Sequence, residues 1–108
     1  MSFDARLLLE GDVATIWLNG ELDASSAPKF NDLISEAAKH ELTRLVLQAE
    51  NLTYMSSAGV RCLVFAQQKL HGRTEIVLVG AQPDVAETIM LTGFDRSITM
   101  EQATGGLR

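Results

Sequence analysis

The fold is decided by the stretch Leu52-Thr53-Tyr54-Met55-Ser56-Ser57-Ala58-Gly59-Val60-Arg61, which joins two segments of different periodicity. Before it, residues 45–49 form a short apolar run that is typical of a buried strand. After it, Val60, Leu63 and Leu70 recur at helical spacing. The stretch therefore predicts a strand, a tight turn and the start of a helix.

Two adjacent serines, Ser56 and Ser57, stand where this helix is expected to begin. A serine at such a position can cap the helix by accepting a backbone N–H bond. A helix N-terminus also favours negative charge, so a serine there can instead carry a phosphate that a partner recognises. The spacing of the residues leaves both interpretations open.

Composition limits the classes of function. The chain has 108 residues, 46% hydrophobic and 21% charged, which is typical of one globular domain spanning residues 1–108. We expect about residues 3–103 to be ordered and residues 104–108 to form a loose tail. A formal charge of −5 without a basic cluster argues against nucleic-acid binding. No segment has the length of a membrane span or the layout of a signal peptide, so we expect a cytoplasmic protein.

Nothing in the sequence indicates an enzyme or a cofactor. Cys62 is the single cysteine, which excludes an internal disulfide and a cysteine-based zinc site, and we expect it to pack in the core. His40 and His71 are far apart, which makes a metal site improbable. A Gly-x-Ser-x-Gly motif, which marks a hydrolase nucleophile, is absent.

The N-terminal half predicts a hairpin followed by a helix. Alternating apolar residues over 3–10 and 13–18 indicate two strands, and Gly11-Asp12 between them is a turn signal. We expect residues 19–23 to be a loop. Pro28 fits only the first turn of the helix that follows, with Ser25 or Ser26 as its cap. The apolar stripe of this helix comprises Ala27, Phe30, Leu33, Ile34, Ala37 and Ala38.

The C-terminal half alternates strands and helices. A helix over about 58–71 ends at Gly72-Arg73, and residues 76–79 form the next strand. Pro83 starts a further helix, whose inward residues are expected to be Val85, Ile89 and Met90. Gly93 suits a left-handed C-cap, and residues 98–100 suit a short edge strand.

This order of elements predicts an α/β fold, with a mixed β-sheet, an opening antiparallel hairpin and helices packed on one side. The two strand–helix–strand crossovers should be right-handed and make their strands parallel. Sites in such sheets form where strand ends meet helix N-termini. We therefore expect residues 20–23 and 55–59 to converge at one end of the sheet.

Three motifs together resemble a known family. They are Gly20-Glu21-Leu22-Asp23 after the hairpin, Tyr54-Met55-Ser56-Ser57-Ala58-Gly59 before a helix, and Leu91-Thr92-Gly93-Phe94 near the end. In this order and at these separations they resemble the STAS domains, and within them the single-domain bacterial anti-sigma factor antagonists. The resemblance covers about residues 3–103. It implies no catalysis and a partner-switching role, in which phosphorylation of one serine ends the binding of an anti-sigma factor.

The resemblance also assigns roles to residues. The phosphorylated serine of the family matches Ser57, with Ser56 as the alternative acceptor, and Asp23 matches an acidic residue of the neighbouring loop. Common antagonists have an aspartate where this chain has Ser56, and another where it has Gln48. The expected partner-binding residues are Glu21, Asp23, Met55, Ser56, Ser57, Ala58, Gly59 and Arg61.

Two functions follow from the resemblance. The first is an anti-sigma factor antagonist, whose partner is an anti-sigma factor and serine kinase related to the histidine-kinase ATPases. Phosphorylation at Ser57 would then release the complex. The second is a STAS adaptor that is not phosphorylated, such as a cytoplasmic partner of an ABC transporter ATPase or of a signalling assembly. In either case we expect a monomer or a weak dimer.

Overall fold

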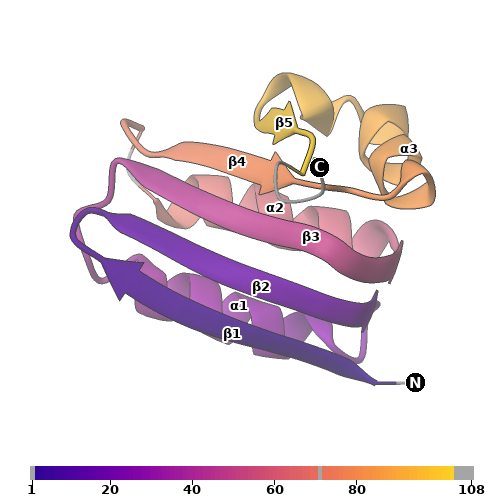
Figure 1. Cartoon of the computed structure of the whole chain (residues 1–108), viewed down its shortest axis with the longest axis horizontal. Helices are drawn as coiled ribbons and strands as arrows, with labels where there is room; N and C mark the ends of the chain where they lie inside the picture. The colour runs from indigo at the N-terminus through magenta and orange to yellow at the C-terminus, as the bar shows by residue number, and fades with distance from the viewer. Residues whose placement is uncertain (1, 71, 104–108) are drawn as a thin grey trace.

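The computed structural model describes residues 2–70 and 72–103. They form a five-stranded sheet in the order β1-β2-β3-β4-β5, in which β1 is antiparallel to β2 and the other neighbours are parallel (Figure 1). The elements in chain order are β1 (Phe3–Glu10), β2 (Val13–Leu22), α1 (Ala27–Ala37), β3 (Arg44–Met55), α2 (Ser57–Lys69), β4 (Glu75–Val79), α3 (Pro83–Thr92), a 3-10 turn η1 (Phe94–Arg96) and β5 (Thr99–Glu101). The predicted mixed sheet with an opening hairpin is confirmed.

The hairpin closes through the two predicted turn residues. Glu10 pairs with Val13, so Gly11 and Asp12 alone connect β1 to β2. Gly11 has φ 61, whereas Asp12 has a negative φ. A positive φ at the first central residue only is the pattern of a type II′ turn, whose twist matches that of the two strands.

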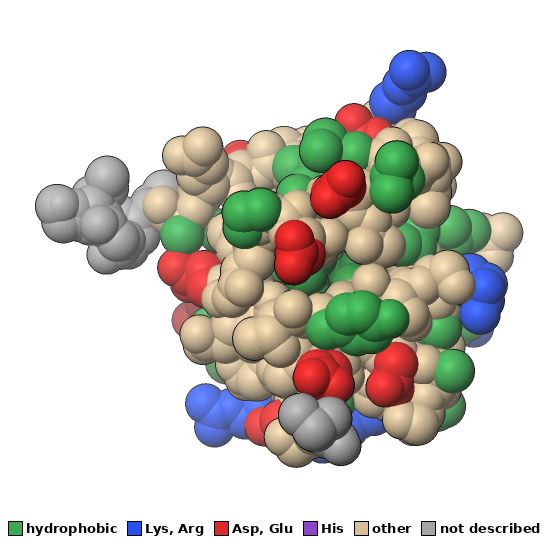
Figure 2. Space-filling model, turned by 90° about the vertical axis from the view of Figure 1, so that its right-hand side faces the viewer, with side chains coloured by type: hydrophobic (Ala, Val, Ile, Leu, Met, Phe, Trp, Pro, Cys, Tyr) green, Lys and Arg blue, Asp and Glu red, His purple; other side chains and the backbone are tan. Residues whose placement is uncertain are grey.

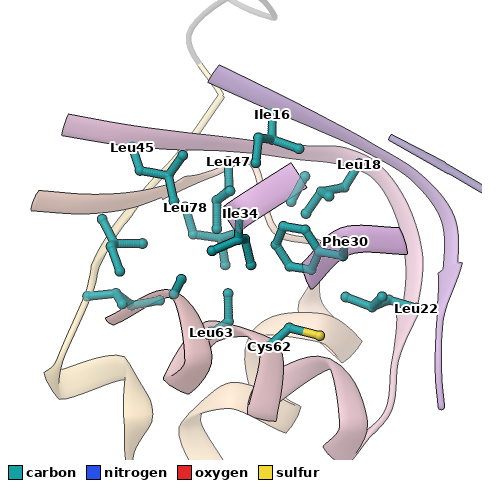
Figure 3. Close-up of a cluster of buried hydrophobic side chains, with 14 of the residues drawn as sticks. Ile16, Leu18, Leu22, Phe30, Ile34, Leu45, Leu47, Cys62, Leu63 and Leu78 are labelled. Carbon is teal, nitrogen blue, oxygen red and sulfur yellow. The ribbon is translucent and has the colours of Figure 1, made fainter. Parts of the chain in front are cut away.

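The helices cover one face of the sheet and share its core. α1 and α2 lie behind the strands in Figure 1, and α3 lies beside the upper strands. Phe30 and Ile34 of α1 and Leu63 of α2 are each 0% exposed and meet the inward side chains of the strands (Figure 3). Burying a large aliphatic or aromatic side chain stabilises a fold by about 1.5–3 kcal/mol. These contacts fix both helices on the sheet.

No helix among residues 2–70 and 72–103 covers the other face of the sheet. On β2 the side chains of Ala14, Ile16 and Leu18 are buried, whereas Trp17 between them is 38% exposed. Leu8 of β1 is 44% exposed. This alternation is what a sheet with one packed and one solvated face requires.

Strands β2 and β3 extend further than the sequence indicated. Residues 19–22 were expected in a loop, but β2 continues to Leu22 and β3 to Met55. The pairing shifts register between Trp17 and Asn19 and again after Gly20. Gly20 has φ 96, and a Cβ there would collide with the carbonyl oxygen of Ser2. At each shift β3 contains one residue more than β2, and at the second shift the extra residue is Thr53. These bulges of β3, together with the close approach of Gly20 to Ser2, let the strands continue where the residue types suggest a break.

The third helix agrees with the prediction except at one residue. Pro83 begins α3, Gly93 caps it with φ 79, and Val85 and Ile89 are buried. Met90 is 53% exposed, so its predicted inward position is wrong. Met90 lies about 100° around the helix from Ile89, so it points away from the face of α3 on which Val85 and Ile89 pack against the core. The expected tail at 104–108 lies outside the described residues.

Candidate functional site

The carboxyl ends of β2 and β3 meet the N-terminus of α2 at one end of the sheet. Leu22 lies opposite Met55 in the parallel pair, and the backbone N–H of Ser56 donates to the carbonyl of Leu22 at 2.9 Å. The convergence of residues 20–23 with residues 55–59 is therefore present in the structure. We call this region the sheet-end surface. It comprises Glu21, Asp23, Met55, Ser56, Ser57, Ala58, Gly59 and Arg61.

The two serines of this surface have different environments. Ser56 is the N-cap of α2, and its Oγ accepts the N–H of Ala58 at 3.2 Å. Ser57 is the first helical residue and is exposed. Its hydroxyl makes no hydrogen bond to any residue that the structure describes. The capping role thus belongs to Ser56, and Ser57 presents an unengaged hydroxyl to solvent at the positive end of the helix.

Close packing beneath the serines depends on Gly59. A Cβ on Gly59 would lie 2.6 Å from Cγ of Met55 and 3.0 Å from Cδ2 of Leu22. Met55 is 2% exposed and Ala58 7% exposed. These predicted partner-binding residues therefore support the surface from within, and the side chains that reach solvent are Glu21, Asp23, Ser56, Ser57 and Arg61.

The Asp23 carboxylate organises the start of α1. Its Oδ1 accepts the hydroxyl of Ser25 at 2.7 Å and the backbone N–H of Ser25 at 3.0 Å. It also accepts the N–H of Ser26 at 3.2 Å. These bonds, above all the one from the Ser25 hydroxyl, lower the pKa of the Asp23 carboxyl. Asp23 is thus held in its ionised form beside the sheet-end surface.

Ser26 and Thr53 are residues of this region that the motif comparison missed. Ser26 Oγ donates to the carbonyl of Glu21 at 3.0 Å and accepts the N–H of Asp23 at 2.9 Å. Thr53 Oγ donates to the carbonyl of Gly20 at 3.1 Å. Their signal in the sequence was a hydroxyl beside a strand end, a place where side chains often bond to backbone groups.

Arg61 and Cys62 follow Ser57 on α2 and differ in access to solvent. Arg61 is exposed, lies four residues after Ser57, and forms no ion pair with the described part of the chain. Cys62 is 1% exposed, and burial raises the pKa of its thiol to about 11. A thiol of this pKa is not a nucleophile near neutral pH, so the predicted packing role of Cys62 is confirmed.

The surface carries more negative than positive charge. Figure 2 shows the end of the molecule that holds the carboxyl ends of β2 and β3, with acidic and apolar side chains interspersed and Lys and Arg at the margins. Over residues 2–70 and 72–103, no group of three or more His, Cys, Asp or Glu side chains is placed to hold a metal ion. Within the same residues, no helix is long and apolar enough to cross a membrane.

Comparison with known proteins agrees with the observed fold. The family model of the STAS domain matches residues 7–106. An anti-sigma factor antagonist from Mycobacterium paratuberculosis superposes with a TM-score of 0.84 at 23% identity, covering 93% of this chain and 86% of that one. Unphosphorylated SpoIIAA, an anti-sigma factor antagonist, gives 0.78 at 24% identity, covering 95% and 89%. Phosphorylated SpoIIAA, a cell fate determinant of Bacillus, gives 0.71 at 23% identity, covering 95% and 92%.

Proposed function

The chain belongs to the STAS domain family, and on this premise we propose that it is an anti-sigma factor antagonist that is switched by phosphorylation of Ser57. In its unmodified form it binds an anti-sigma factor through the sheet-end surface. Phosphorylation ends this binding and leaves the fold intact. The proposal assigns no catalytic step to the chain itself.

The observation that carries the proposal is the state of the Ser57 hydroxyl. It is exposed, it makes no hydrogen bond within the described chain, and it stands at the first residue of a helix. Ser56 already supplies the cap, so a phosphate on Ser57 removes no bond that stabilises α2. A kinase can therefore modify Ser57 without unfolding the turn.

The local charges explain how the modified form can stay folded. A phosphate adds about −1.5 to −2 charges, which the positive end of α2 favours. Arg61 lies one helical turn further along, at the spacing where two side chains meet, and can pair with it. The ionised Asp23 opposes it from the neighbouring loop. The effect of modification therefore falls on the partner, which would meet a bulky dianion where the unmodified surface is neutral.

The proposed partner is an anti-sigma factor that is also a serine kinase of the histidine-kinase-like ATPase class. Solved structures with this fold include anti-sigma factor antagonists, one of them in unphosphorylated and phosphorylated forms. The direct contacts are assigned to Glu21, Asp23, Ser56, Ser57 and Arg61. Met55, Ala58 and Gly59 set the shape of the surface beneath them.

The test is phosphate incorporation by the cognate kinase, identified by capturing partners from lysate of the source organism. We expect Ser57→Ala to abolish incorporation and Ser56→Ala to retain it. Ser25→Ala is the matched control, because it removes an exposed serine hydroxyl that Asp23 already engages. Ser57→Asp should weaken partner binding and leave the melting temperature within a few degrees of the wild type.

Two results would contradict the proposal. If only Ser56→Ala blocks incorporation, the modified residue is Ser56. If the captured partner binds the wild type and Ser57→Asp equally, and no kinase modifies either serine, the chain is a constitutive STAS adaptor.

A further inference from the structure

The outer edge of β1 has no strand beside it in the described structure. β1 is the first strand of the sheet and pairs with β2 alone. It is eight residues long. An edge strand of this length presents a row of backbone N–H and C=O groups to any strand that can align with it.

The register of the hairpin shows which residues present these groups. Glu10 and Val13 flank a two-residue turn and form a hydrogen-bonded pair, as such turns require. At the far end, the N–H of Glu21 donates to the carbonyl of Ser2 at 3.2 Å. Hydrogen-bonded pairs alternate along an antiparallel ladder, so the even-numbered residues of β1 bond to β2. The open edge is therefore formed by the backbones of Phe3, Ala5, Leu7 and Leu9.

The side chains of the even-numbered residues give this edge a self-complementary pattern. Arg6, Leu8 and Glu10 lie on the uncovered face of the sheet, and Leu8 is 44% exposed. Neither Arg6 nor Glu10 forms an ion pair within residues 2–70 and 72–103. A basic residue and an acidic residue therefore stand at equal distances on either side of an exposed leucine.

We infer that β1 is a homodimerisation edge, on which two copies pair antiparallel about a two-fold axis that passes between their Leu8 residues. In this register Arg6 of each copy faces Glu10 of the other. Leu7 faces Leu9 in a hydrogen-bonded pair, and Leu8 faces Leu8 in a non-hydrogen-bonded pair. The two sheets then form one continuous sheet, and the exposed leucines cover each other.

Other antiparallel registers in which the odd-numbered residues of β1 form the hydrogen bonds between the two copies are less favourable. Centring the axis on Arg6 opposes two arginines, and centring it on Leu7 opposes Asp4 and Glu10. Centring it on Ala5 pairs Asp4 with Arg6, but Asp4 is already bound to Lys29 of α1 at 3.0 Å. The register centred on Leu8 keeps that ion pair and satisfies both unpaired charges.

The dimer should be weak and compatible with partner binding. Five paired residues on each copy bury less than the roughly 1,200 Å² of a stable interface, so association depends on concentration. The edge of β1 is also separate from the residues of the sheet-end surface. This inference therefore does not depend on the proposed function, and its test uses no kinase or partner.

The first test is disulfide trapping of the full chain. Facing residues in a non-hydrogen-bonded pair have Cα atoms about 4.5 Å apart, which a disulfide can span. We expect Leu8→Cys to form a covalent dimer under mild oxidation. Arg6→Cys is the matched control on the same face, because its two thiols would be four residues apart, about 13 Å. Cys62 is buried and should not react.

The second test is charge reversal, followed by sedimentation velocity over a range of protein concentrations. Arg6→Glu should raise the dimer dissociation constant about tenfold or more, because each copy then opposes two acidic residues. The double variant Arg6→Glu/Glu10→Arg should restore the wild-type constant to within about threefold. A merely structural role of Arg6 predicts no such rescue.

Three outcomes would overturn the inference. The first is a wild type that sediments as a monomer at every concentration up to about 1 mM, above which association is not specific. The second is equal cross-linking of Leu8→Cys and Arg6→Cys. The third is a double variant that associates no better than Arg6→Glu.

Discussion

Two pairs of adjacent serines start two helices at the same end of the sheet, and they are built differently. Ser25 and Ser26 precede α1, and both hydroxyls bond to Asp23 or to its neighbours. Ser56 and Ser57 begin α2, and within the described part of the chain only the Ser56 hydroxyl makes a hydrogen bond. The first pair is a structural turn closed around a carboxylate. In the second pair Ser56 caps the helix, and Ser57 is the residue that we propose is phosphorylated.

The difference shows that a serine near a helix N-terminus is not by itself a regulatory site. Ser25 is exposed, as Ser57 is, yet its hydroxyl donates the shortest of the hydrogen bonds that hold the Asp23 loop. Modifying it would cost the loop a hydrogen bond. Phosphorylation of Ser57 would remove no hydrogen bond of the described residues, and this difference is the reason why we propose Ser57 as the modified serine.

The largest effect should come from truncating Phe30, the buried side chain of α1 that follows the first pair of serines. Phe30 lies four residues after Ser26 and is 0% exposed. Phe30→Ala should lower the free energy of unfolding by roughly 3–5 kcal/mol, through lost burial and the cavity left behind. Urea denaturation measures this change. The exposed Lys29→Ala should cost less than about 1 kcal/mol, and a similar loss for both variants would contradict the packing described.

A smaller effect separates the serines themselves. Ser26→Ala leaves the N–H of Asp23 and the carbonyl of Glu21 without their partner, so it should cost roughly 1–2 kcal/mol. Ser56→Ala should cost about 1 kcal/mol as a lost helix cap. Ser57→Ala should stay within about 0.5 kcal/mol of the wild type. Thermal and urea unfolding of the three variants give this ranking. An equal loss of stability for Ser57→Ala and Ser26→Ala would contradict the different roles given to these two serines.

The smallest effect concerns acid. The pKa of Asp23 is lowered in the folded state, so its contribution to stability is present above the unfolded pKa of about 3.9 and is lost as the pH falls through the folded pKa. Asp23→Asn keeps an acceptor oxygen that does not titrate. As the pH is lowered through about 4 and below, the melting temperature of the wild type should therefore decrease relative to that of this variant. Asp4 also has a lowered pKa but is common to both proteins, so a constant difference would contradict the role of Asp23.

Sequence reasoning found the order of the elements because local signals agree with the fold. Gly11-Asp12, Pro28, Pro83 and Gly93 each stand where a turn, a helix start or a helix end was predicted. It failed at strand ends, where pairing across the sheet decides the outcome. β3 reaches Met55 because β2 lies beside it, and the register shift at Thr53 of β3 is not visible in the sequence of either strand alone.

The candidate site was predicted in location but not in detail. The predicted convergence of residues 20–23 with residues 55–59 is present in the structure, and the spacing left the roles of Ser56 and Ser57 open. The extended backbone of Ser56, with φ −89° and ψ 179°, and the bond from the Ala58 N–H to its Oγ show that Ser56 is the capping serine. In the same way Met90 shows that an apolar residue on a short helix need not face the core, because its neighbour Ile89 already does.

The strand order along the sheet repeats the strand order along the chain, and this has a consequence for folding during synthesis. Each new strand adds to the edge formed by the one before it, so no strand must wait for a later segment to fill a gap. Every loop closure spans at most one crossover, which keeps the entropic cost of each step low. The hairpin, α1 and β3 can therefore assemble as they leave the ribosome, with β4 and β5 completing the edge afterwards.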